Sequence, residues 1–554
     1  MNGAAWVEAS GWEDRAAAIA ARHGISPVLA MLLSASPRSD DELSAFLVPD
    51  GVAWPDPFRI PGLEAAARRL AEGLARQEQI IVHGDYDVDG LMGTAVLVGG
   101  LRSFGAKVEA FIPSRFDGGY GLSEASYEAV RQAGASLVLT TDCGTNAREI
   151  GLRLQAAGVD LIVSDHHLPS DEGQPPCILV NPKMVEGHPD RELCGAAVAL
   201  QVLRGVAVVL GKPLSMEPFL RLVAIATVAD VVPMTPVNRK ICKLGFLALE
   251  TTPNPGLAQL LEGVLKTGPV RGHHISYHLA PRFNAAGRME DARLVLDLLL
   301  ERNPGLAARL KVKLEALNQQ RKALQVVAYE EAEEQARLLP ETSRVVFAAS
   351  SSWHKGIIGP VAARLAEAFK KSAFVVGVEG DMGLGSGRAW KGDNVAALLG
   401  HASDLLVRYG GHSGAAGFTV RAEHIPDLAR RLCGLKVPGA DEACPEIFYP
   451  IEPVHLGDAW DAWGHLDPFG PGNPEPYLGL KGLCPKGQKV LTGGHLSWDV
   501  GVPGCAPVQF IAWNGIAGGM DPSSLAPSRI IIGRPAPQHR PGPVSFYFSI
   551  AAIL

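Results

Sequence analysis

Four short clusters of acidic and histidine residues occur in the first half of the chain. They read HGDYDVDG (83–90), TTDCGTN (140–146), SDHH (164–167) and VADVVP (228–233). Each follows a short apolar run, and together they hold more carboxylate and imidazole groups than one metal ion can bind. The clusters therefore predict a site for two metal ions, and such sites mostly hydrolyse phosphate esters.

The first cluster places its polar residues at alternating positions. Alternation along an extended strand end directs the side chains of His83, Asp85, Asp87 and Asp89 to one side. A solvated acidic turn is the alternative interpretation. Neutral imidazole suits Mn²⁺ and Zn²⁺, whereas carboxylates suit Mg²⁺ and Mn²⁺, so a mixed set of ligands favours Mn²⁺.

The other three clusters have simpler alternatives when each is taken alone. Asp142 follows the run SLVLTT and could cap the next helix. The adjacent pair His166 and His167 is harder to accommodate in a core. Asp230 ends the apolar run LVAIATVAD, where a buried carboxylate needs a partner, although a cap or a turn before Pro233 would also place it there. Four clusters at successive strand ends favour one shared metal site over four unrelated turns.

Short apolar runs alternate with helical stretches from Gln79 to about Asn238. This alternation predicts a parallel sheet covered by helices on both faces. In such sheets ligands collect at the carboxyl ends of the strands. All four clusters occupy such ends, so the fold prediction and the site prediction agree.

The rest of the chain changes character twice. Leucines at helical spacing predict one long helix over 305–339, and a second α/β segment follows over about 343–435. After Pro438 the chain is rich in Pro and Gly with short Val/Ile/Phe runs, which predicts a small barrel or sandwich. The expected domains are an N-terminal helical leader (1–60), a catalytic domain (61–290), a connector helix (291–340), a second α/β domain (341–437) and a β-rich nucleic-acid-binding domain (438–554).

Bulk composition bounds the class of protein. The net charge of −7 argues against a nucleic-acid binder, but a metal site concentrates acidic residues and a DNA path needs only a local basic stripe. No apolar run approaches the ~20 residues of a membrane helix, and the N-terminus has no signal-peptide pattern. The eight cysteines form no CxxC pair, which indicates a cytoplasmic chain with reduced thiols.

In order, the four clusters resemble the motifs of the DHH phosphoesterase superfamily. Segments such as DPFRIPGLEAA, WHKGIIGPVAARL, YGGHSGAAGF and LDPFGPGNPEP are similar to the RecJ family within it. The resemblance covers about Asp56 to Tyr477 and is weaker after that. It implies an α/β fold, in which a parallel-sheet DHH domain is joined by a long helix to a smaller α/β DHHA1 domain, with a C-terminal OB-like β-barrel.

The resemblance also implies roles for residues of the four clusters. The implied metal ligands are His83, Asp87, Asp89, Asp142, His166 and Asp230. The implied catalytic residues are Asp142, bridging the ions, His167, beside the scissile phosphate, and Asp85, behind the ligands. The ions are expected to be two Mn²⁺ or Mg²⁺.

The motif GSGRA (385–389) suits a terminal phosphate. Its glycines allow close approach, Ser386 offers a hydroxyl, and Arg388 can bind two phosphate oxygens at once. A plain β-turn is the alternative. The resemblance suggests that this pocket holds the 5′-phosphate, which would dictate 5′→3′ exonucleolytic cutting.

Further candidate substrate-binding residues lie in four other motifs, and each has a structural alternative. Arg115 could bind phosphate while Tyr120 stacks on a base or lies in the core. Three polar residues of an expected loop, APRFNAAGRM, could bind substrate or form surface salt bridges. His354 could reach phosphate or cap a helix near Ile358. The loop residues are Arg282, Asn284 and Arg288. In YGGHSGAAGF (409–418), Gly411 and His412 could contact phosphate or form a turn.

By resemblance, the expected function is degradation of single-stranded DNA 5′→3′ to mononucleotides in recombination and repair. A monomer supplied with substrate by a single-strand-binding protein and a helicase is expected. One alternative is a DHH hydrolase for small substrates such as pyrophosphate or dinucleotides, but the leader and the added β-rich domain disfavour it. The other is a non-catalytic replication scaffold. Such scaffolds lose the metal ligands, whereas this sequence retains them.

Overall fold

The computed structural model describes most of the chain and divides it into two compact units. Unit 1 comprises Met1–Pro281, Leu296–Lys311 and Cys444–Leu554, and unit 2 comprises Arg282–Val295 and Val312–Ala443. The described residues are 5–115, 121–170, 173–265, 269–435, 445–483, 485–502, 507–513, 515, 528–537 and 546–554.

Unit 1 contains the expected parallel sheet, with strand order β3-β2-β4-β5-β6 and parallel pairing throughout. Its strands are short and apolar, so both faces are buried. They are β2 (Gln79–Gly84), β3 (Lys107–Phe111), β4 (Leu137–Thr141), β5 (Asp160–Ser164) and β6 (Ile178–Val180).

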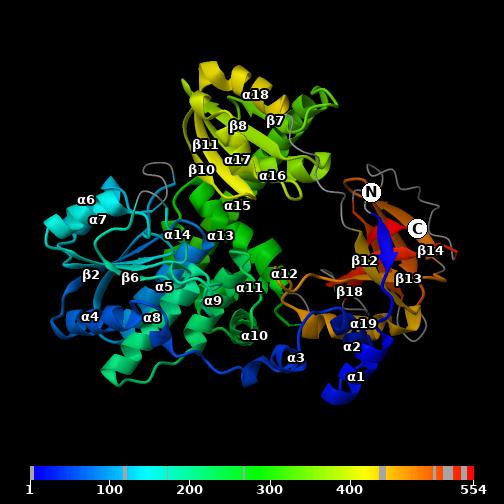
Figure 1. The fold of residues 1–554 in the computed structure, drawn as a ribbon, viewed down its shortest axis with the longest axis horizontal. Coiled ribbons are helices and arrows are strands. Elements are labelled where there is room, and N and C mark those ends of the chain that lie inside the picture. The colour runs from blue at the N-terminus through cyan, green and yellow to red at the C-terminus, as the bar shows by residue number, and fades with distance from the viewer. Residues whose placement is uncertain are drawn as a thin grey trace. The chain divides into compact units, whose positions relative to one another are not determined.

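Helices cover both faces of this sheet (Figure 1). One face packs Ile81, Val138 and Val163 against Val130 and Leu154 of the helices α6 and α7. The other face lies against α4, α5 and α8. The bounds are α4 (Leu63–Ala75), α5 (Val88–Ser103), α6 (Glu124–Gln132), α7 (Arg148–Ala156) and α8 (Gly195–Leu210).

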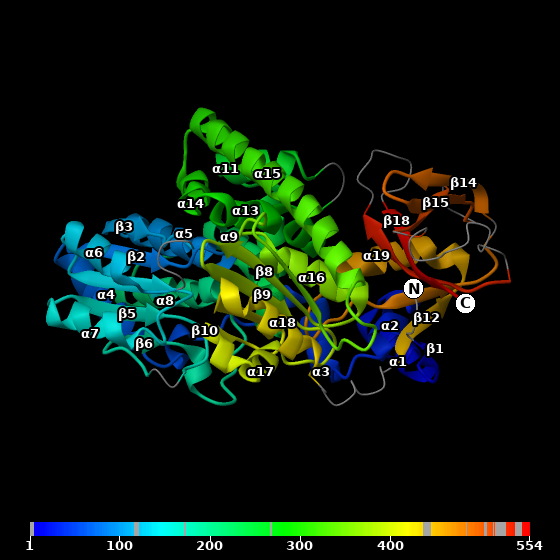
Figure 2. The same ribbon diagram turned by 90° about the horizontal axis from the view of Figure 1, so that it is seen from above.

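Helical segments follow the sheet along the chain. The helices α9 and α10 pack on each other, and α9 also contacts α5. A short π-helix over Ile275–Leu279 follows α12. The predicted long helix is confirmed as α15 (Figure 2). The bounds are α9 (Glu217–Ala229), α10 (Pro236–Glu250), α11 (Pro255–Glu262), α12 (Gly272–His274), α13 (Ala280–Met289), α14 (Arg293–Leu300) and α15 (Pro304–Arg337).

The C-terminal segment and the N-terminal strand β1 together form an eight-stranded sheet of order β1-β12-β13-β17-β18-β16-β15-β14. Its bounds are β1 (Trp6–Glu8), β12 (Glu446–Ile451), α19 (Leu456–Leu466), β13 (Tyr477–Leu480), β14 (Pro485–Leu491), β15 (His495–Val500), β16 (Val508–Ala512), β17 (Ile531–Pro537) and β18 (Phe546–Ile553). The predicted β-rich domain is thus present. Over the described residues the sheet is open rather than a closed barrel, because β1 and β12 extend it by parallel pairing to a free edge.

The N-terminal helices share a hydrophobic core with this C-terminal sheet. Ile19, Leu33 and Phe46 belong to the same buried cluster as Trp463 and Phe548. The helices are α1 (Glu13–His23), α2 (Pro27–Ser34) and α3 (Asp40–Leu47). The two ends of the sequence therefore fold together, which no local pattern in the leader indicates.

Unit 2 holds a mixed sheet of order β10-β11-β9-β8-β7. One face packs on α16 and α15 through Val361, Leu365 and Ala332, and the other packs on α17 and α18. The bounds are β7 (Val346–Ser350), α16 (Ile358–Phe369), β8 (Ala373–Glu379), β9 (Met382–Arg388), α17 (Val395–Gly400), β10 (Leu406–Gly411), β11 (Ala415–Arg421) and α18 (Ile425–Cys433). The predicted α/β fold class is confirmed.

Within the described ranges, the structure has no helix that combines the length and apolarity of a membrane span.

Candidate active site

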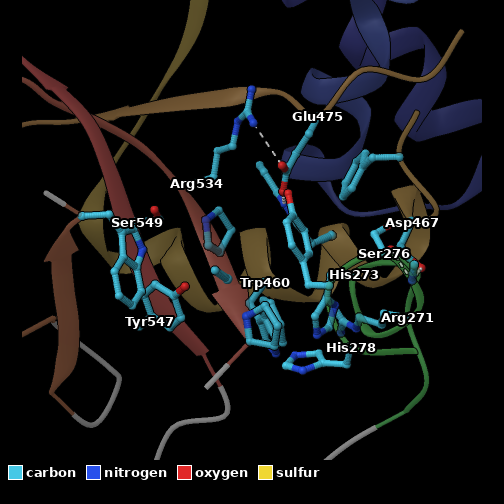
Figure 3. A pocket seen from close by; sticks show the side chains of 18 residues that line it. Arg271, His273, Ser276, His278, Trp460, Asp467, Glu475, Arg534, Tyr547 and Ser549 are labelled. Carbon is cyan, nitrogen blue, oxygen red and sulfur yellow. Dashed lines mark hydrogen bonds and ion pairs between the residues drawn. The ribbon is translucent and has the colours of Figure 1, made fainter. Parts of the chain in front are cut away.

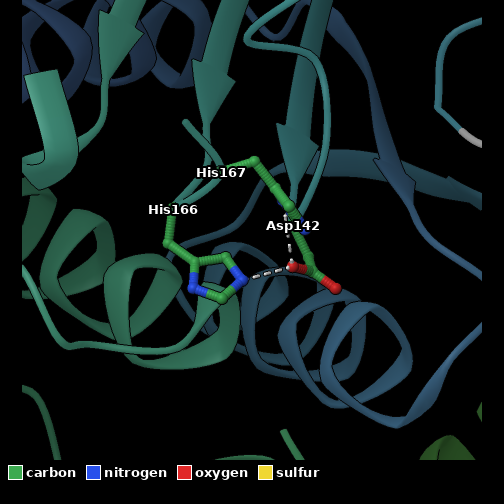
Figure 4. Close-up of side chains that lie close together, drawn as sticks. All are labelled: Asp142, His166 and His167. Atoms are coloured by element: carbon green, nitrogen blue, oxygen red, sulfur yellow. Dashed lines mark ion pairs between the residues drawn. The ribbon is translucent and has the colours of Figure 1, made fainter. Parts of the chain in front are cut away.

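The four sequence clusters meet in one region of unit 1. Three of them follow β2, β4 and β5, but Asp230 is the C-cap residue of helix α9, so the prediction that all four lie at strand ends is wrong for the fourth and the alternative of a cap holds there. Their ligand atoms form three groups, and within each group the atoms lie within 4.8 Å of one another. Asp142 belongs to two groups and His166 belongs to two, so the groups overlap in one site. Figure 4 shows the group of Asp142, His166 and His167. The groups are Asp142, His166 and His167; Asp89, His166 and Asp230; and Asp85, Asp87 and Asp142.

One nitrogen of His166 faces three carboxylates. Its Nε2 lies 3.0 Å from Oδ1 of Asp142, 3.6 Å from Oδ2 of Asp89 and 3.8 Å from Oδ2 of Asp230. Burial lowers the pKa of His166 to about 3, so the ring is neutral near pH 7. A neutral imidazole among carboxylates is the donor set that Mn²⁺ accepts.

Asp142 is held in a backbone conformation that non-glycine residues seldom adopt. Its φ is +63°, and its N–H donates to the carbonyl of Ser164 on β5. A Cβ atom at Gly195 would lie 2.6 Å from Cβ of Asp142, so only glycine lets the start of α8 approach this closely. The residue preceding α7 is Ala147, without a side-chain cap, so the alternative of a helix cap at Asp142 is wrong.

Two other carboxylates do act at helix starts. Both oxygens of Asp89 accept backbone N–H groups of α8, from Gly195 at 2.6 Å and Ala196 at 2.8 Å. Asp87 caps α5 by accepting from Gly90 at 3.1 Å. The predicted extended strand end is therefore wrong beyond Gly84, because β2 ends there and α5 begins at Val88. The alternative of a solvated turn is also wrong for Asp85 and Asp89, which are buried.

The carboxylates crowd one another in a buried space. Burial, and then repulsion from neighbouring carboxylates, raises the pKa of Asp89 to about 6 and that of Asp230 to about 8. The pKa values of Asp85 and Asp142 are raised well above the usual range for the same two reasons. Among the described residues, the buried Oδ1 of Asp85 has no hydrogen-bond partner. Such a cluster needs cations, so the residues fit divalent metal ions.

His167 is oriented by a residue to which the sequence analysis assigned no role. Nδ1 of His167 lies 2.8 Å from Oδ1 of Asp165, whose other oxygen accepts the N–H of Thr145 at 3.0 Å. Burial acts to lower the pKa of His167, but the hydrogen bond and the charge of Asp165 outweigh it and raise that pKa. Burial acts to raise the pKa of Asp165, yet its bond to His167 holds it well below the usual range. The position of Asp165 directly before the two histidines was the sequence signal that could have indicated this role.

His83 lies in the same region but joins none of the three ligand groups of the described residues. Its Nε2 is 2.8 Å from Oγ of Ser126, and its Nδ1 is 3.5 Å from Sγ of Cys143. Burial lowers its pKa to about 4, so the ring is neutral. The structure thus engages both ring nitrogens, and a ligand role for His83 stays a prediction.

Arg115 stacks on an aromatic ring other than the one expected. Its guanidinium carbon lies 4.2 Å from the ring centroid of Tyr86, between the two acidic residues Asp85 and Asp87. Tyr120, the expected aromatic, lies outside the described residues. The sequence analysis did not consider Tyr86 as a partner of Arg115. Its position as an aromatic residue inside the acidic motif was the signal that could have identified it.

In unit 2, Ser386 and Arg388 lie next to a helix start. Nη1 of Arg388 donates to Oγ of Ser386 at 2.9 Å and to the carbonyl of Gly387 at 2.8 Å. A Cβ at Gly359 would lie 3.0 Å from Nη2 of Arg388, so the first turn of α16 packs beside the guanidinium. The two residues belong to β9, which pairs with β8 and β11, so the alternative of a β-turn is wrong. A cation and a hydroxyl beside a helix N-terminus form a site suited to anions.

The segment APRFNAAGRM is helix α13, not the expected loop. Its small residues favour a helix, and Pro281 fits in the first turn. On a helix Asn284 and Arg288 share a face, whereas Arg282 points elsewhere. Nε of Arg282 donates to Oε1 of Glu315 at 2.7 Å, in agreement with the salt-bridge alternative.

Arg288 and His354 meet at Gly356. Nη1 of Arg288 donates to the carbonyl of Gly356 at 3.2 Å, and Nδ1 of His354 accepts its N–H at 3.0 Å. The residue before α16 is Ile357, without a side-chain cap, so the helix-cap alternative for His354 is wrong.

Gly411 and His412 lie at the hairpin between β10 and β11. Gly411 has φ +139°, and a Cβ there would lie 2.4 Å from the carbonyl of Ala415. The N–H of His412 donates to the same carbonyl at 2.8 Å, and its side chain is exposed. Ala415 is paired with Arg388 across the sheet, so this turn adjoins the anion site.

Comparison with known proteins agrees with both units. The DHH family, N-terminal domain, matches residues 79–227, and the DHHA1 domain matches 342–435. A solved structure of exonuclease RecJ bound to manganese is 34% identical, with a TM-score of 0.62, and the match covers 70% of this chain and 97% of that one. The chain belongs to the RecJ family.

Two further RecJ proteins extend the match. The Bacillus subtilis single-stranded-DNA-specific exonuclease RecJ is 32% identical over 480 residues, covering 84% of this chain. The crystal structure of Thermus thermophilus RecJ with Mn²⁺ matches with a TM-score of 0.82 and 28% identity, covering 99% of this chain and 79% of that one. The chain spans 60% of the length of the Bacillus subtilis relative.

Proposed function

We propose that this chain is a metal-dependent exonuclease that degrades single-stranded DNA 5′→3′ to mononucleotides, in recombination and repair. The observation that carries the proposal is the convergence of Asp142, His166 and their neighbours into three overlapping ligand groups. Membership of a family whose relatives are single-stranded-DNA-specific exonucleases supports the substrate.

The ions would be two Mn²⁺ or Mg²⁺, both of which solved structures of RecJ from Thermus thermophilus contain. Asp85, Asp87 and Asp142 could hold one ion, while Asp89, His166 and Asp230 could hold the other. A ligand role for His83 belongs to the same proposal. When bound, the ions would lower the pKa of a bound water and stabilise charge on the attacking and leaving oxygens.

His167 is suited to move a proton at the scissile phosphate. Asp165 fixes Nδ1 of His167 and raises the pKa of that ring, which favours the doubly protonated form with a proton at Nε2. In that state His167 can stabilise negative charge on the phosphate or protonate the leaving oxygen. The burial and the fixed hydrogen bond of Asp165 keep the ring in one orientation.

The anion site of unit 2 would determine the direction of cutting. Ser386 and Arg388, beside the N-terminus of α16, offer donors to a terminal 5′-phosphate. A strand held by that phosphate would present its first phosphodiester bond for cleavage. Arg115, Arg282, Asn284, Arg288, His354, Gly411 and His412 are proposed to contact the strand further along.

The protein partners, the oligomeric state and the localisation are also proposals. A single-strand-binding protein and a helicase would supply the strand to a cytoplasmic monomer. The domain boundaries stated from the sequence, including 61–290 for catalysis and 438–554 for strand binding, stay predictions.

The test is hydrolysis of one long single strand labelled at either end, with Mn²⁺ or Mg²⁺ present. We expect a 5′ label to be released first as a mononucleotide, whereas a 3′ label should stay on progressively shorter fragments. Cleavage of dinucleotides alone would support the small-substrate alternative, and no cleavage with intact metal binding would support a scaffold.

A further inference from the structure

Unit 1 contains a basic cavity, lined by Arg239, Lys243 and Arg271, that shares no residue with the candidate metal site. Its volume of about 350 Å³ lies within the range of about 300–1,000 Å³ typical of small-molecule sites. Its walls come from four segments that are distant in the sequence: residues 47–50, the helix α10, residues 269–271 and the C-terminal end of α19. The folded chain is therefore needed to assemble it.

Arg239 has a structural role in the basic cavity. Its side chain is almost fully buried, and its guanidinium donates to the carbonyl of Phe46 and to those of residues 465–467. The latter carbonyls lie at the C-terminal end of α19, where a cation stabilises the helix. Arg239 therefore adds positive charge to the cavity but is already engaged with the protein.

Lys243 and Arg271 converge on Gly464. Nζ of Lys243 donates to the carbonyl of Gly464 at 2.8 Å, and a Cβ at Gly464 would lie 3.3 Å from Nη2 of Arg271. An ammonium group has three N–H donors. Over the described residues, the structure gives the ammonium of Lys243 this one hydrogen bond, so the group can also donate to a ligand.

An aromatic ring holds Arg271 in place. Its guanidinium carbon lies 4.0 Å from the ring centroid of Trp460. Arg271 and Trp460 also line a larger cavity of about 640 Å³ beside Trp513, which Figure 3 shows. A guanidinium stacked on a ring keeps its N–H edge available for the oxygens of an anion.

One buried carboxylate, Asp467, acts on all three cations. Its attraction does not offset their burial. Burial, and then repulsion from Arg239, lowers the pKa of Lys243 to about 8, and burial lowers the pKa of Arg239 to about 10. Both oxygens of Asp467 are already occupied, because they accept the N–H of Gly272 at 3.1 Å. The cavity therefore carries positive charge that Asp467 does not neutralise.

The two other carboxylates of the lining, Asp50 and Glu250, do not supply the missing charge. Both residues are exposed, and Oε1 of Glu250 accepts the N–H of Val270 at 2.9 Å. In the described part of the chain, neither carboxylate forms an ion pair with a cation of the cavity. Buried cations are costly unless an anion is paired with them, so an anion from solution would stabilise this site.

Apolar side chains lie beside the cations. Phe246 and Val270 are buried in the lining, whereas Val48 and Leu247 are 61% and 60% exposed. An inorganic anion needs no such surface. Cations next to an apolar wall suit a compound that joins a phosphate to an organic group.

We propose that the basic cavity binds a small phosphate monoester, with the phosphate between Lys243 and Arg271 and the organic group against Phe246 and Val270. A phosphate dianion would supply the missing charge, and the two cations can bind several of its oxygens. The compound has two possible sources. One is the mononucleotide that the nuclease would release, which rests on the proposed function, and the other is any other phosphorylated small molecule.

The test is isothermal titration calorimetry of the full chain carrying Arg388→Ala, in EDTA, so that neither the anion site of unit 2 nor a metal ion contributes. Thymidine 5′-monophosphate and phenyl phosphate should both bind, and adding Lys243→Gln should raise both Kd values about 10-fold or more. Lys212→Gln, at an exposed position outside the cavity, is the matched control and should leave them unchanged. No binding by the Arg388→Ala chain, or an unchanged Kd after Lys243→Gln, would overturn the proposal.

Two further variants separate ligand binding from folding. Lys243→Arg retains the charge and should bind both monoesters. Arg271→Gln should weaken binding as Lys243→Gln does, and it decides the result if Lys243→Gln fails to fold. Full affinity in a folded Arg271→Gln chain would overturn the placement of the phosphate.

Other probes identify the ligand. Thymidine should not bind, and inorganic phosphate binding as tightly as phenyl phosphate would overturn the assignment to a monoester. Tighter binding of thymidine 5′-monophosphate than of phenyl phosphate would support nucleotides as the source, and equal binding would support phosphate monoesters in general. If Lys243→Gln weakened binding of a long oligothymidylate but of neither monoester, the cavity would be a strand contact and the proposal would fail. No arm requires catalysis, so the site stands if the monoesters bind and the chain cleaves no DNA.

Discussion

The acidic site of unit 1 and the anion site of unit 2 use opposite electrostatics. In unit 1, buried carboxylates raise one another's pKa values, which is unfavourable until cations are bound. In unit 2, Arg388, Ser386 and a helix N-terminus present donors that need an anion. One site is therefore suited to cations and the other to anions, so substitutions should separate chemistry from the proposed recognition of the 5′ end.

The largest expected effect is on Asp142. Asp142→Ala removes the carboxylate shared by two ligand groups and should lower the rate of hydrolysis by ~10³-fold or more. DNA binding, measured by anisotropy in EDTA, should weaken much less, because phosphate and stacking contacts elsewhere persist. Asp160→Asn, at the opposite end of β5, is the control and should retain activity. Equal loss of binding and cleavage would mean that the two sites are not separable.

The next largest effect is expected at His167. His167→Ala should lower the rate of hydrolysis ~10²-fold, because it removes a positioned proton donor. The sharper measurement is the pH profile of Asp165→Asn. Because Asp165 raises the pKa of His167, its neutralisation should move the alkaline loss of activity to lower pH. A variant with reduced activity but an unmoved profile would limit Asp165 to a structural role.

Metal affinity should depend on pH with a definite sign. Asp230, with a pKa of about 8, must lose its proton to bind a cation, so Mn²⁺ affinity should fall about 10-fold per pH unit below that value. Without metal, folding stability should change with pH in the opposite direction to metal affinity. The pKa of Asp230 is higher in the folded than in the unfolded chain, so its contribution to the free energy of unfolding is lost as pH rises through about 8. Calorimetric Mn²⁺ titration and thermal unfolding between pH 6 and 8 measure both trends. Affinity independent of pH would remove Asp230 from the ligand set.

The smallest expected effect concerns end recognition. Arg388→Ala should raise KM about 5-fold to 10-fold for 5′-phosphorylated strands and leave kcat almost unchanged. For strands with a 5′-hydroxyl, the same substitution should change KM little. Arg421→Ala, at an exposed position of the adjacent strand β11, is the control. An unchanged preference for 5′-phosphate in Arg388→Ala would remove the assignment of the anion site.

Much of the acidic site was predictable because its signals are local. Parallel strands bring their carboxyl ends to one edge, so Asp85 after β2 and Asp142 after β4 could be expected to meet. Asp89 in α5 and Asp230 at the end of α9 reach the same site through helix packing, which the strand pattern does not specify. The roles of Asp165 and Tyr86 were missed, since a hydrogen bond or a stacking contact depends on side-chain orientation. Helix α13 was missed because its polar residues were weighed as ligands and its helix-forming alanines were not.

The sequence alone determined the parallel sheet, the long helix and the acidic and histidine side chains of the candidate metal site, because each follows from periodicity or from chemistry within a few residues. Tertiary structure decided the rest. The shared core of Ile19 and Phe548, the approach of Gly195 to Asp142 and the cavity beside Trp513 join segments far apart in the chain. Such contacts depend on packing between surfaces, and no local pattern specifies which surfaces will meet.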